Sequence, residues 1–161
     1  MGITCVLRAT SSEQSRRMLT NPDAAIRLFT PGSAPVRALH LEKAWHGIHF
    51  LLTHVDVESA ESLGFLLEGG EEVGEDLGYG PARFFSADET RQLNQVLEGI
   101  SDDQLWSHFD PESMSAEGIY PDIWDEDEPE LREEYLEYYH HLKEFVREAS
   151  DAQLGFVVLF T

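Results

Sequence analysis

The two ends of the chain both carry patterns typical of β-strands. Residues 2–8 alternate between apolar and polar side chains and include β-branched ones, which indicates a strand with one buried face. An apolar run extends through residues 155–161, and at this length it predicts a central strand buried on both faces. Residues 81–85 predict a further short strand, because a proline at its start need not donate to the ladder.

Helical periodicity accounts for most of the remaining chain. Apolar residues recur three or four positions apart, so that each segment has one stripe able to face a core. Several segments begin with a capping residue; Ser86-x-x-Glu89 and Ser101-x-x-Gln104, for example, match the capping-box pattern. The predicted helices cover residues 11–19, 22–28, 40–52, 87–100, 102–109, 111–117 and 129–150.

These elements predict one α+β domain over residues 1–161. It is mostly helical, with a small sheet that pairs the N-terminal and C-terminal strands and is covered by helices. A length of 161 residues is close to the usual size of one domain, and 42% apolar with 26% charged residues is typical of a globular chain.

The cellular compartment is predicted from what the chain lacks. Its single cysteine, Cys5, has no partner for an internal disulfide and falls on the same strand face as Ile3 and Leu7, which predicts a buried thiol. No apolar run approaches the roughly 20 residues that span a bilayer, and the first residues lack the features of a signal peptide. We therefore expect a cytoplasmic protein.

Charge is unevenly distributed along the chain. The formal net charge is −20, yet residues 1–50 carry six Lys/Arg and three Asp/Glu, whereas residues 51–161 carry five and 28. Such a field repels the phosphates of nucleic acids and anionic membranes, and it attracts cations and basic protein surfaces. We expect neither nucleic acid nor membrane as a partner, and a basic protein or a small cationic ligand fits. The alternative is that the acidity only keeps the protein soluble.

Three candidate sites follow from the residue pattern, and the first is Glu42, His46 and His49. Spacings of four and three place them on one face of the predicted helix 40–52. Two imidazoles and a carboxylate are a ligand set that zinc or iron can use. An ordinary polar helix face is the alternative, and no metal ligand is assigned.

A glycine-rich acidic loop is the second candidate. Residues 64–80 hold six of the twelve glycines and five carboxylates, so mostly irregular backbone is expected there. Glycine lets backbone approach a ligand closely, and the carboxylates favour a cation or a basic partner. A solvated surface loop is the alternative. The carboxylates assigned to binding are Glu68, Glu71 and Glu72.

Aromatic residues in two loops, 78–83 and 119–124, are the third candidate. If they are exposed beside acids they form a recognition surface, and if they are buried they pin the loops to the core. The other residues assigned to ligand binding are Trp45, His46, His49, Tyr79, Arg83, Tyr120, Asp122 and Trp124.

Four motifs, in order along nearly the whole chain, resemble a known family. They are KAWHGIHFLLT at residues 43–53, GFLLEGGEE at 64–72, GYGPAR at 78–83 and IYPDIW at 119–124. The chain resembles the YfbM-like family, small bacterial proteins classed as a domain of unknown function. The resemblance implies a bacterial cytosolic protein of one α+β domain, and it carries over no activity, cofactor or catalytic residue.

Standard catalytic motifs are absent: the chain has no GxSxG elbow, P-loop, HExxH or CxxC. Catalytic residues and cofactors therefore stay unassigned, and whether the protein is an enzyme stays open. The favoured function is an acidic binding or interaction module that recognises a basic protein or cationic ligand. The alternative is a metal-dependent or hydrolase-like enzyme, in which carboxylates of residues 68–76 face His46 or His49 across a site between the Trp45 helix and the glycine-rich loop.

Overall fold

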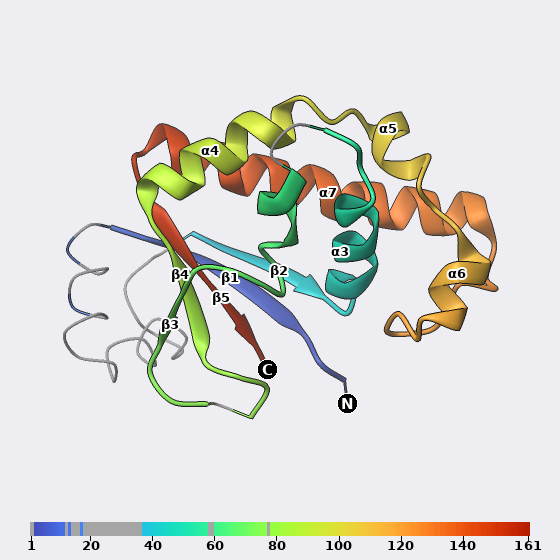
Figure 1. The fold of residues 1–161 in the computed structure, drawn as a ribbon, viewed down its shortest axis with the longest axis horizontal. Coiled ribbons are helices and arrows are strands. Elements are labelled where there is room, and N and C mark those ends of the chain that lie inside the picture. The colour runs from blue at the N-terminus through green and yellow to red at the C-terminus, as the bar shows by residue number, and fades with distance from the viewer. Residues whose placement is uncertain (1, 12, 14–16, 18–36, 58–59, 77) are drawn as a thin grey trace.

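A computed structural model describes residues 2–11, 13, 17, 37–57, 60–76 and 78–161. Within this part of the chain, five antiparallel strands form one sheet in the order β2-β1-β5-β4-β3 (Figure 1). The strands are β1 (Cys5–Thr10), β2 (Ala38–Glu42), β3 (Glu71–Val73), β4 (Ala82–Phe85) and β5 (Gly155–Phe160). The helices are α3 (Trp45–Thr53), the 3₁₀ helix η1 (Ala60–Gly64), α4 (Ala87–Glu98), α5 (Asp102–Trp106), α6 (Pro111–Ala116) and α7 (Glu128–Asp151).

Strand β5 lies at the centre of the sheet, as its continuous apolar run predicts. It pairs with β1 on one side, Leu7 opposite Val158, and with β4 on the other, Phe85 opposite Phe156. The predicted pairing of the first and last strands and the α+β class are therefore confirmed. Both ends of the chain meet at one corner of the sheet, where Thr4 and Thr161 exchange two backbone hydrogen bonds of 2.9 Å.

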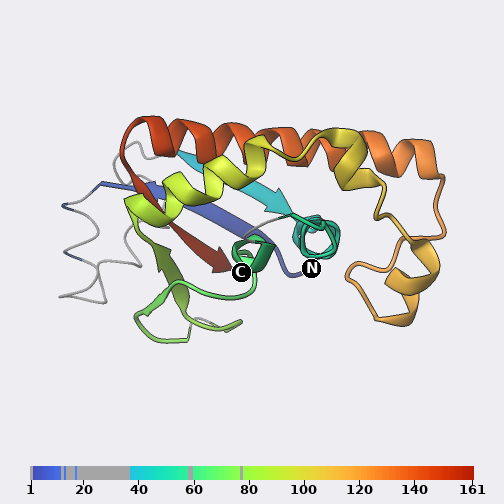
Figure 2. The ribbon, with the colours of Figure 1, turned by 45° about the horizontal axis from the view of Figure 1, so that its top comes forward.

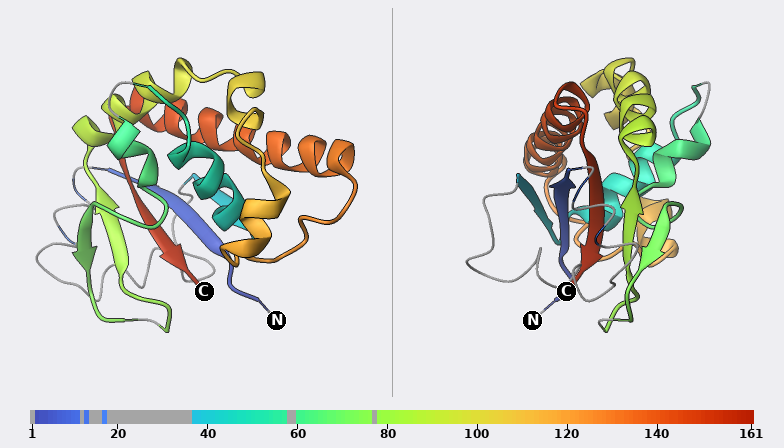
Figure 3. Two further views of the ribbon diagram at one scale, coloured as in Figure 1. Left: turned by 45° about the vertical axis from the view of Figure 1, so that its right-hand side comes forward. Right: turned by 90° about the vertical axis from the view of Figure 1, so that its left-hand side faces the viewer.

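Helices α4 and α7 lie side by side along the same side of the sheet (Figures 2 and 3). The α7 residues that repeat at helical spacing are buried, among them Tyr135, Leu142 and Phe145. The core under these helices centres on Phe156, whose ring stacks on Phe85 at 4.9 Å and meets Phe65 and Phe145 edge-on. None of the described helices combines the length and the apolar character needed to cross a membrane.

The predicted helix starts are formed by their capping residues. The Ser86 hydroxyl accepts the Glu89 N–H, and the Glu89 carboxylate accepts the Ser86 N–H, each at 3.1 Å, which completes the predicted capping box. At the starts of α5 and α6, the side chains of Ser101 and Asp110 accept the backbone N–H groups of Gln104 and Ser113, without the reciprocal bond of a capping box. These side chains satisfy backbone donors that have no partner inside the helix, which explains why the helices begin there.

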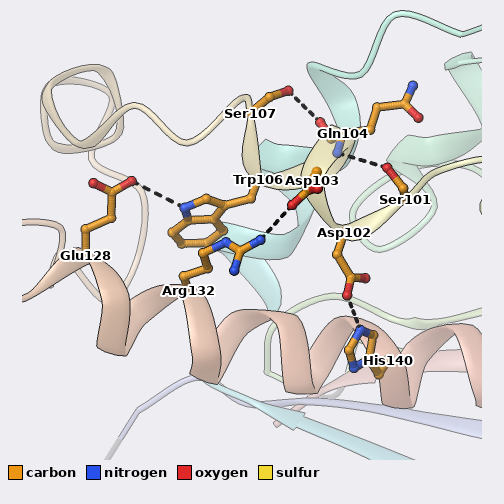
Figure 4. A network of polar contacts seen from close by, with 9 residues as sticks. All are labelled: Ser101, Asp102, Asp103, Gln104, Trp106, Ser107, Glu128, Arg132 and His140. Carbon is orange, nitrogen blue, oxygen red and sulfur yellow. Dashed lines mark hydrogen bonds and ion pairs between the residues drawn. The ribbon is translucent and has the colours of Figure 1, made fainter.

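Polar contacts fasten the short helix α5 to α7 (Figure 4). Arg132 pairs with Asp103 at 2.8 Å, and His140 contacts Asp102 at 2.7 Å. The Trp106 indole donates to Glu128 at 3.3 Å. These groups are partly exposed, so each ion pair contributes at most about 1 kcal/mol, and the buried residues of α5 stabilise the contact more.

The prediction of a helix over residues 40–52 is wrong at its start. Residues 38–42 form strand β2, in which Leu39 and Leu41 are buried and the alternate residues Ala38, His40 and Glu42 are exposed. The helix begins only at Trp45, after a turn in which Glu42 has a φ of +49°. Leu41 fits both an alternating and a helical pattern, and pairing with β1 decides in favour of the strand.

Two smaller differences concern local structure. The loop expected to be mostly irregular at residues 64–80 contains the three-residue strand β3. The helices predicted at residues 11–19 and 22–28 fall outside the described residues, apart from Ser11, Glu13 and Arg17. Cys5 is fully buried as predicted, and burial raises the pKa of its thiol, so it is a structural residue.

Candidate functional site

Helix α3 places Trp45 and His46 against the chain termini and the loop at residues 119–124. The Trp45 indole donates to the Ile3 carbonyl at 2.9 Å. Its ring stacks on the rings of His46 and Tyr120 and meets the Phe160 ring edge-on. Trp45 is only 7% exposed. It therefore holds this corner together, with little surface left for a ligand.

His46 is fixed in one tautomer by its neighbour. Its Nδ1 accepts the Tyr120 N–H at 2.9 Å, so in the neutral ring the proton lies on Nε2. Burial lowers the pKa of His46, which agrees with an imidazole that serves as an acceptor. The Tyr120 hydroxyl in turn accepts the Ile3 N–H at 3.2 Å. The His46 ring thus connects α3 to the loop of residues 119–124.

His49 and Glu68 both border Gly64. A Cβ on Gly64 would lie 3.6 Å from the Glu68 Oε2 and 3.8 Å from the His49 Cε1. Burial and the nearby His46 lower the pKa of His49, against the opposing effect of Glu68. The His49 Nδ1 is enclosed and has no hydrogen-bond partner among the described residues. An imidazole whose pKa is lowered and one carboxylate of the glycine-rich loop therefore lie in the same region, with no direct hydrogen bond or ion pair between them.

Arg83 lies on β4, on the sheet face that the helices cover, and reaches into the same region. Its guanidinium donates to the carbonyls of Leu66 and, at 3.1 Å, Gly69. Its pKa is lowered by burial, while Glu68 and Glu72 act in the opposite direction. Arg83 thereby fixes the backbone of residues 66–69 and balances part of the acidic charge there.

A cavity of about 280 Å³ opens on the other side of this loop, between η1 and the start of α4. This volume is near the lower limit for ligand pockets, so it suits a single side chain or a small amine. Its floor is apolar and its rim is acidic. The lining residues are Glu61, Ser62, Phe65, Glu68, Gly69, Gly70, Phe85, Glu89, Gln92 and Leu93, which we call the acidic pocket.

The remaining loop residues form the tip of the β3–β4 hairpin. The Asp76 Oδ1 accepts the N–H groups of Gly78 and Gly80 at 2.7 and 3.0 Å, and these bonds lower the pKa of Asp76. Tyr79, beside them, is 56% exposed. Glu71 and Glu72 lie on β3 with exposed side chains. The hairpin therefore presents acids and one aromatic ring to solvent.

The structure changes two of the predicted candidate sites, the set Glu42, His46 and His49 and the aromatic residues of the loop 119–124. Glu42 is on β2 and not on α3, so the prediction that it shares a helix face with His46 and His49 is wrong. Trp124 is 2% exposed and donates to the Ile119 carbonyl at 2.8 Å, which makes it a core residue. Asp122, with a φ of +63°, is exposed in the same loop. Within the described ranges, no three His, Cys, Asp or Glu side chains are arranged to hold a metal ion.

Most residues of the acidic pocket were not predicted as site residues. Glu61 and Glu89 lie 28 positions apart in separate helices, and only the packing of η1 beside α4 brings them together. In the sequence, Phe65 and Phe85 belong to apolar stretches that predict ordinary core residues. Glu89 also has a structural role as a capping residue, which accounts for its position without any ligand. Glu68 is the one predicted residue that lines the pocket.

The lowered pKa values of His46 and His49 predict how stability depends on pH. As pH falls through the ordinary histidine range near about 6.5, the unfolded chain takes up protons before the folded one does. The titration of these two histidines should therefore leave the free energy of unfolding unchanged near neutral pH and lower it between about pH 6.5 and 5. Urea unfolding at several pH values measures this change.

The variant His46→Asn provides the matching test. Its amide oxygen can accept the Tyr120 N–H without titrating, so the decrease below about pH 6.5 should become smaller. His141→Asn, on the exposed face of α7, is the matched control for removing one histidine at the surface. An identical profile for His46→Asn and the unmodified protein would show that His46 does not contribute.

Comparison with known proteins places the chain in a family. A crystal structure of the protein of unknown function YfbM from Escherichia coli superposes with a TM-score of 0.76 at 18% identity, covering 98% of this chain and 99% of that one. At this identity the likeness concerns the fold alone. None of the curated proteins compared with the chain matches it. The model of the domain of unknown function DUF1877 matches residues 1–159, and the chain therefore belongs to the DUF1877 family.

Proposed function

We propose that the protein is an acidic binding module of the bacterial cytosol that holds a cationic side chain or small cation in the acidic pocket. The observation that carries the proposal is the composition of that pocket. Three glutamates, Glu61, Glu68 and Glu89, surround a floor containing Phe65 and Phe85, and none of the described lining residues is Lys or Arg. Carboxylates pair with a cation, and aromatic rings attract it through their negative faces.

The surrounding charge supports the same ligand class. Residues 51–161 carry a formal net charge of −23, against +3 for residues 1–50, and they include every residue of the acidic pocket. A field of one sign attracts ligands of the opposite sign and increases their rate of association. The guanidinium of Arg83 donates to the carbonyls of Leu66 and Gly69. It therefore supports the loop and leaves Glu68 and Glu61 available for a ligand.

A second candidate function is a hydrolase-like site at His49 and Glu68. The observation in its favour is that both side chains border Gly64. A neutral imidazole beside a carboxylate is an arrangement that general bases use. This candidate predicts that His49→Gln abolishes turnover of a substrate while leaving cation binding in the acidic pocket intact.

Isothermal titration with the capped tripeptide acetyl-Gly-Arg-Gly-amide tests the binding proposal. The unmodified protein should bind it. The affinity of the double variant E61Q/E68Q should be lower by at least about tenfold, because charge-assisted hydrogen bonds are lost. E133Q/E137Q, with both changes on the exposed face of α7, alters the net charge equally and is the control. Equal weakening by both double variants would mean that the tripeptide responds only to overall charge, and the proposal would fail.

A further inference from the structure

Strand β3 is the last strand on its side of the sheet. Among the described strands it pairs with β4 alone, with Glu71 opposite Phe84, Glu72 opposite Arg83 and Val73 opposite Ala82. An edge strand presents backbone N–H and C=O groups that another extended chain can bind. In this protein the edge starts directly after Gly70, a lining residue of the acidic pocket.

The alternation of the ladder identifies which backbone groups of β3 have no partner among the described strands. The Phe84 carbonyl oxygen faces β3, since a Cβ on Gly70 would lie 2.8 Å from it. The Phe85 carbonyl oxygen faces β5, since a Cβ on Gly155 would collide with it. Neighbouring residues of a strand direct their backbone groups to opposite sides, so Glu71 bonds to Phe84 and Val73 to Ala82. The N–H and C=O of Glu72 are left on the outer edge.

The two ends of this edge carry features that fit one kind of partner. The acidic pocket lies at its start, and the exposed Tyr79 lies in the loop that follows it. Residues 64–90 contain one basic residue, Arg83, which is already engaged by two carbonyls. The charge complementary to this surface is positive along its whole length. A second copy of the same chain, paired through the same strand, would instead place like charges opposite Glu71 and Glu72, which is destabilising.

We propose that the outer edge of β3 binds an extended basic segment of a partner protein as an added strand. The segment would hydrogen-bond with the backbone of Glu72 and place one Lys or Arg in the acidic pocket, so this inference rests on the proposed function. Backbone pairing distinguishes such a segment from a free amine, which carries the charge but no strand. The partner is thus a polypeptide in extended conformation with alternating basic residues, whose side chains on one face have a period of two.

A capped heptapeptide that alternates Lys and Val is the probe. We expect it to bind more tightly than acetyl-Gly-Arg-Gly-amide, and to slow hydrogen exchange at the Glu72 amide. Two further peptides carry the same charges with backbone N-methyl groups on every second residue, one on the odd and one on the even positions. One of them should lose about tenfold in affinity and the other much less, because only one set faces β3. Equal affinity of all three peptides would overturn the inference.

The variants Glu72→Pro and Glu72→Gln separate the backbone from the charge. Both remove one carboxylate, and proline also removes the N–H on the free edge, where it is tolerated. Glu72→Pro should bind the heptapeptide about 3–10-fold more weakly than Glu72→Gln, the effect of about one hydrogen bond. Both should bind the tripeptide equally. Equal affinities of the two variants for the heptapeptide would exclude strand addition and leave the pocket proposal standing. If the unmodified protein did not bind the tripeptide, the pocket proposal itself would be excluded.

Discussion

Replacing Phe156 with alanine is expected to lower the free energy of unfolding by about 3–5 kcal/mol, the range for removing a buried aromatic ring. The ring is fully buried on the central strand and contacts Phe85, Phe65 and Phe145. Its loss removes apolar area from the core and leaves a cavity that three other rings are too constrained to fill. Chemical unfolding followed by tryptophan fluorescence measures the change.

Tyr79→Ala is the control for this experiment. Its side chain is 56% exposed at the hairpin tip, so the free energy of unfolding should change by no more than about 0.5 kcal/mol. Since Phe85 and Phe65 also form the floor of the acidic pocket, Phe156→Ala should weaken binding of the Arg tripeptide as well. A loss of stability below about 1 kcal/mol would contradict the central position assigned to Phe156.

Replacing Arg83 with methionine is expected to lower the free energy of unfolding by about 2–4 kcal/mol. Two hydrogen bonds from a charged donor are lost, to the Leu66 and Gly69 carbonyls, and each such bond contributes about 1.5–3 kcal/mol before solvent screening of this half-buried group. Methionine retains much of the apolar stem, so the change reports mainly on the guanidinium. The loop of residues 66–69 should also become more mobile and the acidic pocket less well formed.

Arg91→Met is the matched control, since Arg91 pairs with Asp88 at 3.3 Å on the exposed face of α4. Exposed pairs contribute at most about 1 kcal/mol, so this variant should be close to the unmodified protein. Arg83→Lys should be intermediate, because an ammonium group lacks the forked donors of a guanidinium. If Arg83→Met were as stable as Arg91→Met, Arg83 would not support the loop.

The sequence was sufficient for elements whose signals are local. The apolar run of β5, the capping box at Ser86 and Glu89, and the stripe of α7 each follow from residues close together in the chain, and all three are confirmed. Strand β2 was not predicted, because Leu41 belongs equally to an alternating pattern and to the helical pattern that continues through Trp45. Only pairing with β1, a contact distant in sequence, distinguishes the two.

The candidate site shows the same division. The glycine-rich loop was identified from its composition, and the structure places Glu68 near both His49 and the acidic pocket. Glu61 and Glu89 carried no local signal, since one lies in a short 3₁₀ helix and the other is a capping residue. Their meeting depends on how η1 packs beside α4, which the pattern of either segment alone does not determine. Trp124 illustrates the converse, because an aromatic residue beside acids can equally be part of the core.

The central claim is that the acidic pocket binds a cation, and a nuclear magnetic resonance titration tests it most directly. Acetyl-Gly-Arg-Gly-amide is added to the ¹⁵N-labelled protein, and the amide signals of the whole chain are followed. The largest shifts are expected at Gly69, Gly70 and Gln92, which line the pocket, and they should disappear in E61Q/E68Q. Shifts spread evenly over the acidic face of α7, or no saturable shift at Gly69 and Gly70, would contradict the claim.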